Sequence, residues 1–255
     1  MWNWIAQLSE LRRDGQPVAM VTVTGCTGST PREIGAKMLV FPSGEIRGTI
    51  GGGHLEELAI KDAVKCLESG TAKTIRYPLG AKTGQCCGGI VDLLFEMVNT
   101  GPSLYLFGAG HVGQAVCRSM VGTPFTVHVI DEREEWVQSP QIPSEVVRHH
   151  CEWPDFVHEA RWDHEKAYVA IMTHRHDTDQ EIVADVIKRP AKYIGLIGSH
   201  SKWERFKQRL EIRGVEESAL ARVKCPIGID TGGKAPQEVA ISLAAELLRI
   251  HYARP

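Results

Sequence analysis

The sequence contains no long hydrophobic run and no strong excess of charge of either sign. No segment approaches the roughly 18 consecutive apolar residues that a membrane-spanning helix needs. The first residues, Met-Trp-Asn-Trp, lack the basic and apolar regions of a secretory signal peptide. The net charge of −2 gives no electrostatic reason to bind nucleic acid or a membrane surface. We therefore expect a cytoplasmic protein with neither of these partners.

Cysteine spacing typical of a disulfide framework is also lacking. The seven cysteines are an odd number, so free thiols in a reducing compartment are the better interpretation. No internal repeat and no low-complexity segment is present. A chain of 255 residues with a hydrophobic fraction of 43% can form the core of one large domain or two modest ones.

The pattern of strands and helices predicts two domains. Turn-forming residues at 99–103 separate an N-terminal α+β domain, residues 1–100, from a Rossmann-like domain, residues 101–255. In the second half, apolar strands alternate with helices, which is typical of a doubly wound parallel sheet. We expect its strands at 104–107, 125–130, around 146, 167–172 and 193–197. The spacing of Ser201 and Glu204 predicts a capping box at the start of a further helix.

A dinucleotide-binding fingerprint lies at the start of the second half. Gly108, Gly110 and Gly113 form G-x-G-x-x-G between a short apolar strand and a helix. In this motif the first glycine allows a tight turn, the second lets the backbone approach a pyrophosphate, and the third allows close helix packing. Asp131 ends the next strand, where the fingerprint places an acid that binds ribose hydroxyls and favours NAD over NADP.

Three glycine-rich loops of the first half, at 25–32, 48–57 and 84–89, are too rich in reactive side chains to be plain turns. Gly51, Gly52 and Gly53 precede a predicted helix, and the amides and dipole of its N-terminus favour an anion such as a phosphate. In the alternative, Glu56 and Glu57 compensate that dipole. His54 could cap the helix, bind a ligand or act as an acid or base, and for a single histidine we favour a structural role.

The adjacent cysteines Cys86 and Cys87, in the sequence Gly-Gln-Cys-Cys-Gly-Gly, are the sharpest feature of the first half. Their glycine surroundings favour accessible thiols, and backbone amides can lower a thiol pKa. Such thiols can bind a soft metal, attack an electrophile or carry a persulfide; otherwise cysteine is simply small here. No second Cys/His pair with zinc-ligand spacing follows.

A polar segment after the 167–172 strand contains His174, His176, Asp177 and Asp179. The carboxyl ends of parallel strands form the ligand-binding edge of such sheets, so these side chains are candidates for metal ligands or a polar rim. The alternative, which we favour for one of the two residues, is that Asp177 or Thr178 caps the following helix. We expect Ser199 and Lys202 to face the same crevice.

Several motifs together resemble the XdhC/CoxI family of xanthine dehydrogenase accessory factors, and the resemblance covers nearly the whole chain. These motifs are Gly28-Ser-Thr-Pro-Arg, Gly35-Ala-Lys-Met-Leu-Val, Gly48-Thr-Ile-Gly-Gly-Gly-His-Leu-Glu, Gly84-Gln-Cys-Cys-Gly-Gly, Gly108-Ala-Gly-His-Val-Gly, Gly195-Leu-Ile-Gly-Ser and Cys225-Pro-Ile-Gly.

The resemblance implies a maturation chaperone that binds molybdenum cofactor (molybdopterin), supports its sulfuration by a cysteine desulfurase and delivers it to apo-xanthine dehydrogenase, with a homodimer as one assembly. It implies that Cys86 and Cys87 contact molybdenum or its sulfur. The remaining implied cofactor-binding residues are Ser29, Arg32, Lys37, Gly51, Gly52, Gly53 and His54 in the first domain. In the second domain, Gly108, Gly110, Gly113 and Asp131 would bind NAD(P) or another nucleotide.

Two other functions are compatible with single motifs. A dinucleotide-dependent oxidoreductase would use the fingerprint, with the first half as its substrate domain, but no Tyr-x-x-x-Lys pair or catalytic His-Asp arrangement can be assigned in the sequence. A metal-dependent hydrolase would use His174, His176 and Asp177.

Overall fold

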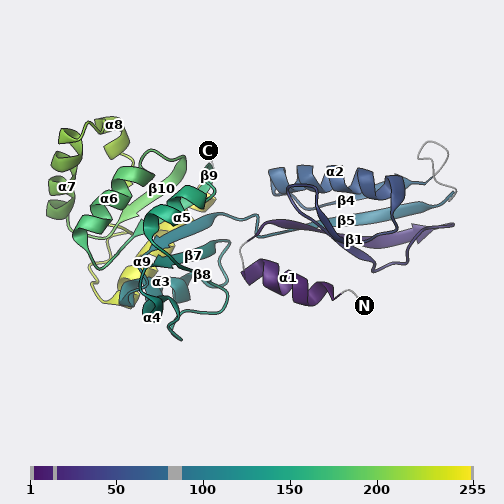
Figure 1. The fold of residues 1–255 in the computed structure, drawn as a ribbon, viewed down its shortest axis with the longest axis horizontal. Coiled ribbons are helices and arrows are strands. Elements are labelled where there is room, and N and C mark those ends of the chain that lie inside the picture. The colour runs from purple at the N-terminus through teal and green to yellow at the C-terminus, as the bar shows by residue number, and fades with distance from the viewer. Residues whose placement is uncertain (1–2, 14–15, 80–87, 254–255) are drawn as a thin grey trace. The chain divides into compact units, whose positions relative to one another are not determined.

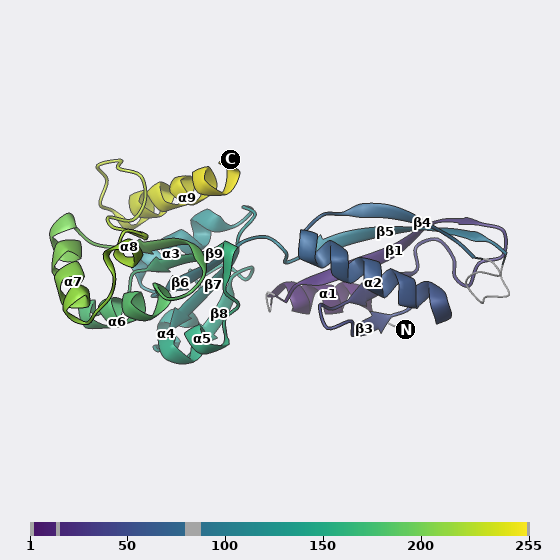
Figure 2. The same ribbon diagram turned by 90° about the horizontal axis from the view of Figure 1, so that it is seen from above.

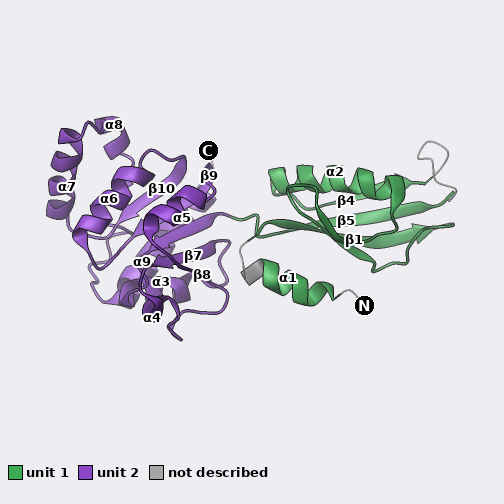
Figure 3. Cartoon of the chain, viewed as in Figure 1, with its two compact units in different colours: residues 1–101 green, residues 102–255 purple. Residues whose placement is uncertain are grey.

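The chain forms two compact units, residues 1–101 and 102–255 (Figure 3). The computed structural model describes residues 3–13, 16–79 and 88–253. No helix of these described residues is long and apolar enough to cross a membrane.

The first unit is an antiparallel sheet with one helix on each face (Figure 1). The sheet has the strand order β3-β2-β1-β5-β4. In chain order the elements are α1 (Trp4–Arg13), β1 (Val18–Thr27), β2 (Lys37–Val40), β3 (Ile46–Gly48), α2 (Gly53–Ser69), β4 (Lys73–Pro78) and β5 (Ile90–Val98).

Alternation along the strands explains this two-sided packing, because successive side chains of a strand point to opposite faces. Met38 and Val40 pack in the larger core beneath α2, with Leu55 and Ala59 of that helix. Leu39 points the other way and packs with Leu11, in the smaller cluster on the α1 face. The long strand β1 pairs with both β2 and β5 and so joins the two halves of the sheet.

The second unit is a six-stranded parallel sheet with the strand order β11-β10-β9-β6-β7-β8. Its elements are β6 (Ser103–Phe107), α3 (His111–Met120), β7 (Thr126–Asp131), α4 (Glu134–Val137), β8 (Val147–His150), α5 (Trp153–Glu159), β9 (Asp163–Ile171), α6 (His176–Val186), β10 (Ala191–Leu196), α7 (His200–Ile212), α8 (Glu217–Leu220), β11 (Val223–Lys224) and α9 (Pro236–Tyr252).

Helices cover both faces of this parallel sheet (Figure 2). One core contains residues of α3 and α9, and the other contains residues of α5, α6 and α7. The strand order reverses at β6, which lies between β7 and β9. In open α/β sheets the ligand crevice lies at the carboxyl ends of the strands at this reversal point. The predicted fold class, an α+β domain followed by a Rossmann-like domain, is confirmed.

One local prediction is wrong. Helix α7 begins at His200, and its N-cap is Ser199, whose hydroxyl accepts a hydrogen bond from the Lys202 amide at 3.2 Å. Ser201 therefore lies inside the helix and does not form a capping box with Glu204. Either serine can serve as an N-cap, and in the structure Ser199 takes this role.

Candidate functional site

The structure brings parts of the glycine-rich loops of the first unit together. A Cβ atom on Gly51 would lie 2.6 Å from the Pro31 ring, so the loop before α2 packs tightly against the β1–β2 loop. On the other side, a Cβ on Gly28 would lie 3.2 Å from the Cα of Gly89, and a side chain on Gly89 would collide with the carbonyl of Ser29. These glycines are therefore required for close backbone approach, which gathers the loops at one end of the sheet.

The amides of the Gly51 loop already have an anionic partner. Glu56 Oε1 accepts hydrogen bonds from the amides of Ile50 at 2.9 Å, Gly51 at 3.1 Å and Gly52 at 2.8 Å, and from the Thr49 hydroxyl. Burial opposes ionisation of this carboxyl, but these donors outweigh it and lower the pKa of Glu56. The carboxylate thus takes the place beside Ile50 to Gly52 that an external phosphate would use.

The first turn of α2 follows this loop. The amides of the first helical residues have no acceptor within a helix, and the helix begins at Gly53 after an N-cap, Gly52, that forms no side-chain cap. His54 lies in this turn and pairs with Glu57 at 3.1 Å.

The other predicted residues of the first unit differ in position. Ser29 and Arg32 are exposed on the loop between β1 and β2. The Lys37 ammonium, in contrast, lies over the Trp4 ring at 5.0 Å and donates to the Thr22 hydroxyl at 3.2 Å. Lys37 therefore projects from the α1 face of the sheet, away from the α2 core.

Cys86 and Cys87 lie outside the described residues. Cys26, in the neighbouring loop, is half-buried, and its thiol donates to the Arg32 carbonyl at 3.4 Å. Cys66 and Cys117 are buried among apolar residues, and burial raises the pKa of both thiols, that of Cys117 to about 12. These two cysteines are core residues.

In the second unit, the three fingerprint glycines differ in whether the structure leaves room for a side chain. Gly108 has φ +111°, and a Cβ there would collide with the Met172 carbonyl. A Cβ on Gly113 would collide with the Gly108 carbonyl. Gly110, in contrast, has φ −67°, and a Cβ there would meet nothing within 4 Å. Two glycines are thus required by packing, while the third leaves open space at the N-terminus of α3.

Asp131 is engaged within the protein. Its carboxylate accepts from the Ala109 amide at 2.8 Å and from the Arg133 amide at 3.1 Å, and it forms a two-point ion pair with the Arg133 guanidinium, both distances 2.8 Å. Burial opposes ionisation of this group, but these donors prevail and lower the pKa of Asp131. The side chain is only 4% exposed. Asp131 therefore links the glycine turn to the end of β7.

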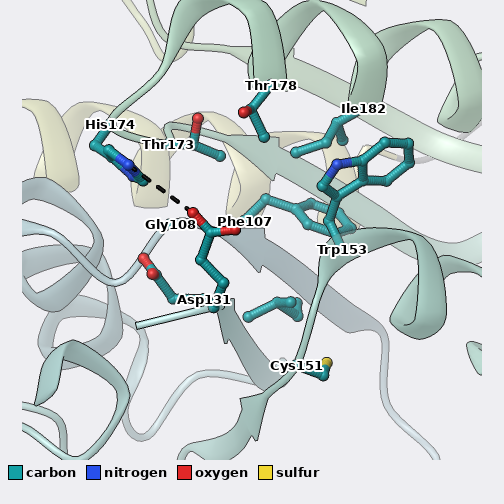
Figure 4. Close-up of a pocket in the computed structure, with 11 residues that line it drawn as sticks. Phe107, Gly108, Asp131, Cys151, Trp153, Thr173, His174, Thr178 and Ile182 are labelled. Carbon is teal, nitrogen blue, oxygen red and sulfur yellow. Dashed lines mark ion pairs between the residues drawn. The ribbon is translucent and has the colours of Figure 1, made fainter. Parts of the chain in front are cut away.

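A small pocket with a volume of about 30 Å³ opens beside this turn (Figure 4). It lies at the ends of β6, β7 and β9, where the strand order reverses. Its lining includes Phe107, Gly108, Ile130, Asp131, Glu132, Cys151, Trp153, Thr173, His174, Thr178 and Ile182. The crevice was predicted at this position, but Glu132, Cys151 and Trp153 were not predicted as lining residues. Glu132 follows the predicted strand at 125–130 closely, whereas Cys151 and Trp153 lie several residues after the strand predicted around 146.

The polar segment after β9 is held by a buried ion pair. Asp179 is fully buried and accepts from the Thr173 amide and hydroxyl at 3.0 and 2.7 Å, while the Lys202 ammonium donates to it at 2.7 Å. Helix α6 begins at His176 and its N-cap is Arg175, so the expectation that Asp177 or Thr178 caps the helix is wrong. Within the described ranges, no group of three or more His, Cys, Asp or Glu side chains could hold a metal ion.

Comparison with known proteins finds two family models on this chain. Residues 11–78 match the model of the XdhC and CoxI family, and residues 104–247 match that of the XdhC Rossmann domain.

Two curated relatives come from Escherichia coli (strain K12). The uncharacterized protein YqeB is 31% identical over 99% of this chain and 47% of its own length. The molybdenum cofactor insertion chaperone PaoD is 22% identical over 95% of this chain and 86% of its own length. A protein of Bacillus subtilis (strain 168), named as a probable subunit of xanthine dehydrogenase, is 26% identical over 62% of this chain and 46% of its own length. The chain thus spans about half the length of YqeB and of the Bacillus subtilis relative.

A crystal structure described as a xanthine dehydrogenase from Bacillus halodurans has the same fold. It aligns with a TM-score of 0.54 and 21% identity, over 100% of this chain and 97% of that one.

Proposed function

Because this chain belongs to the XdhC and CoxI family, we propose that it is an accessory protein that binds molybdenum cofactor, supports its sulfuration and delivers it to apo-xanthine dehydrogenase. The names of two relatives, a molybdenum cofactor insertion chaperone and a probable xanthine dehydrogenase subunit, support this role. We place the protein in the cytoplasm, with a cysteine desulfurase as the sulfur donor. A homodimer is the assembly to test by sedimentation.

The convergence of loops in the first unit is the observation that carries the proposal. Molybdopterin has a phosphate at one end and sulfur ligands to the metal at the other. For the phosphate, the structure offers the exposed Arg32 and Ser29 side chains and the first-turn amides from Gly53. Charge-assisted hydrogen bonds from a guanidinium and from helix N-terminal amides are typical phosphate contacts. The residues present therefore fit this end of the group.

The sulfur end matches the chemistry of Cys86 and Cys87. When bound, the cofactor supplies a soft metal centre with sulfur ligands, for which thiolates are the matching protein ligands. In our proposal, Cys86 and Cys87 bind the molybdenum or its sulfur. Glu56 holds the loop at Ile50 to Gly52 in place, and Arg32, Ser29 and the α2 N-terminus bind the phosphate.

Purification from a molybdenum-replete host tests the proposal. Wild type should contain bound molybdenum and pterin in near-stoichiometric amounts and should activate apo-xanthine dehydrogenase. The double variant Cys86→Ser/Cys87→Ser should lose at least tenfold in retained molybdenum and in transferred activity, equivalent to about 1.4 kcal/mol in a binding constant.

Cys26→Ser is the matched control. It removes a thiol from the neighbouring loop whose hydrogen is already donated to the Arg32 carbonyl, and it should retain the cofactor. Equal retention by wild type and the double variant would show that Cys86 and Cys87 do not bind the cofactor. Turnover of NADH with a defined carbonyl substrate at around ten per second, an ordinary enzyme rate, would instead favour the oxidoreductase and overturn the chaperone role.

A further inference from the structure

Helix α9 of the second unit has an exposed apolar face on the side opposite its buried one. On the buried side, Ala240, Leu243 and Leu247 pack in the core. On the other side, Ile241 is 56% and Tyr252 is 66% exposed. Figure 2 shows this helix on the outer side of the unit. A helix on the surface of a globular protein normally presents polar residues to solvent, so packing within the unit does not explain this face.

Four residues form a continuous stripe along the exposed face. Ile241, Ala245, Leu248 and Tyr252 follow one another at alternating spacings of four and three residues. This spacing places them on one side of a helix with 3.6 residues per turn. Ala245 and Leu248 are half-buried, and the small Ala245 lies near the middle of the stripe. A narrow apolar stripe of this kind is the pattern by which one helix packs against another.

Exposed apolar residues gather around this stripe. Within the described part of the chain, eight large apolar side chains are exposed, and four of them lie on α9 or beside it: Val121, Ile229, Ile241 and Tyr252. The Ile229 carbonyl accepts from the Ser242 hydroxyl of the helix. Ser119, two residues before Val121, accepts from the Gln237 side chain at 2.9 Å. Singly scattered apolar residues need no explanation, but such a concentration marks an interaction surface.

The charges beside the stripe favour a second copy of the same chain as the partner. Glu238 and Arg249 are exposed on one flank of the stripe, near the two ends of α9. One oxygen of Glu238 accepts from the Ala235 amide at 2.9 Å, and the Arg249 guanidinium has no hydrogen-bond or ion-pair partner among the described residues. About a two-fold axis, a contact of one residue with another is repeated with the chains exchanged. Two antiparallel copies of α9 therefore bring Glu238 of each chain beside Arg249 of the other.

We propose that a second copy of this chain packs against α9, with the two helices antiparallel and the two-fold axis near Ala245. Ile241 of each copy packs against Leu248 of the other, and the small Ala245 lets the helices approach closely. The apolar stripe forms the centre of the contact and the Glu238–Arg249 pairs form its rim, which is the usual arrangement of an interface. The proposal gives the homodimer proposed above its contact surface, and it does not depend on molybdenum cofactor.

Sedimentation equilibrium of the purified full-length chain, over a dilution series, tests this interface. Wild type should form a reversible dimer. In Ile241→Glu the dissociation constant of the dimer should rise at least tenfold, because the new carboxylate would be buried without a partner. The monomer should remain folded, because the Ile241 side chain is exposed. Ile212→Glu is the matched control, since Ile212 is 87% exposed on α7 and lies outside the stripe. It should dimerise as wild type does.

The rim is tested by one substitution in two backgrounds. Glu238→Gln removes the charge but keeps an oxygen that can accept from the Ala235 amide. In wild type it should weaken the dimer about threefold, because two exposed ion pairs are lost. In Arg249→Glu it should strengthen the dimer about threefold, because a like-charge contact is relieved. A purely structural role of Glu238 would change the dissociation constant in the same direction in both backgrounds.

The proposal is overturned if wild type is monomeric throughout the series, if Ile241→Glu dimerises as tightly as wild type, or if Glu238→Gln acts in the same direction in both backgrounds. A monomeric wild type whose Ile241→Glu variant activates apo-xanthine dehydrogenase poorly would assign the face to that partner instead. Molybdenum retention is measured separately, so a dimer without bound molybdenum would support this interface while contradicting the cofactor proposal.

Discussion

Removal of the Glu56 carboxylate should release the loop that precedes α2. In the structure, one oxygen of Glu56 accepts from the amides of Ile50, Gly51 and Gly52 and from the Thr49 hydroxyl. A hydrogen bond to a charged group contributes roughly 1.5–3 kcal/mol, but donors that share a half-exposed oxygen do not contribute additively. We therefore expect Glu56→Ala to destabilise the closed loop by about 2 kcal/mol, or roughly 30-fold in its equilibrium population.

Amide hydrogen exchange measures this effect directly. The amides of Ile50, Gly51 and Gly52 should exchange roughly 30-fold faster in Glu56→Ala. If the proposed function is right, cofactor retention should also fall, because the turn proposed to bind the phosphate is no longer held. Glu57→Ala is the control, since it removes an acid from the same helical turn whose only described partner is the side chain of His54. Its exchange and retention should remain near those of wild type.

The pH dependence of the loop follows from the same contact. The pKa of Glu56 in the folded protein is lower than its ordinary value of 4.5. Its stabilising contribution is therefore fully present above about pH 4.5 and is lost as the pH falls through the lowered pKa.

Unchanged amide exchange in Glu56→Ala would refute the conclusion that this carboxylate holds the loop. Tighter cofactor binding by this variant would show that the phosphate replaces the carboxylate.

Three further predictions concern the second unit. Gly110→Val should change the melting temperature little and should abolish the binding of any phosphate-bearing ligand of this unit in titration. Gly113→Ala should lower the free energy of unfolding in urea by about 3 kcal/mol, because its methyl group overpacks the turn. Burial lowers the pKa of His128 from its ordinary value of 6.5 to about 3. As the pH falls, His128 is therefore protonated in the unfolded chain before it is protonated in the folded protein. The free energy of unfolding should drop by about 2 kcal/mol from pH 7 to pH 5 in wild type, and by clearly less in His128→Gln. An equal pH dependence of unfolding in the two proteins would contradict this. Lys202→Met should lower the free energy of unfolding by about 3–5 kcal/mol, because it leaves the Asp179 carboxylate buried without its cation. The double variant Lys202→Met/Asp179→Asn should recover part of this stability, because it also removes the buried charge.

Side-chain periodicity and turn residues were sufficient to predict most of the fold. Alternation in 18–24 and 90–98 predicted strands because one face of the antiparallel sheet packs under α2. Apolar strands separated by helices predicted the parallel sheet, since both of its faces are covered. The predicted start of α7 is wrong because Ser199 and Ser201 both suit an N-cap, and only the folded chain shows that the Ser199 hydroxyl accepts from the Lys202 amide.

The candidate site was predictable in its residue types but not in its contacts. Glycines such as Gly51, Gly108 and Gly113 can be predicted from the sequence because close packing and backbone conformation require them at these positions. The sequence could not decide whether the amides beside Gly51 face a ligand or Glu56, because both alternatives satisfy the same donors. Likewise, Asp131 and Glu132 are adjacent acids at the end of a strand, and the sequence could not decide which of them pairs with Arg133.

The features that follow from the sequence alone are local: which segments form strands and helices, and where the backbone must turn. Which donors and acceptors meet depends on the folded chain. Arg133 turns back onto Asp131 and leaves Glu132 at the pocket, and Lys202 comes from another helix to neutralise Asp179. These pairings depend on distances between elements, which are set by packing of the core and not by the spacing of residues along the chain.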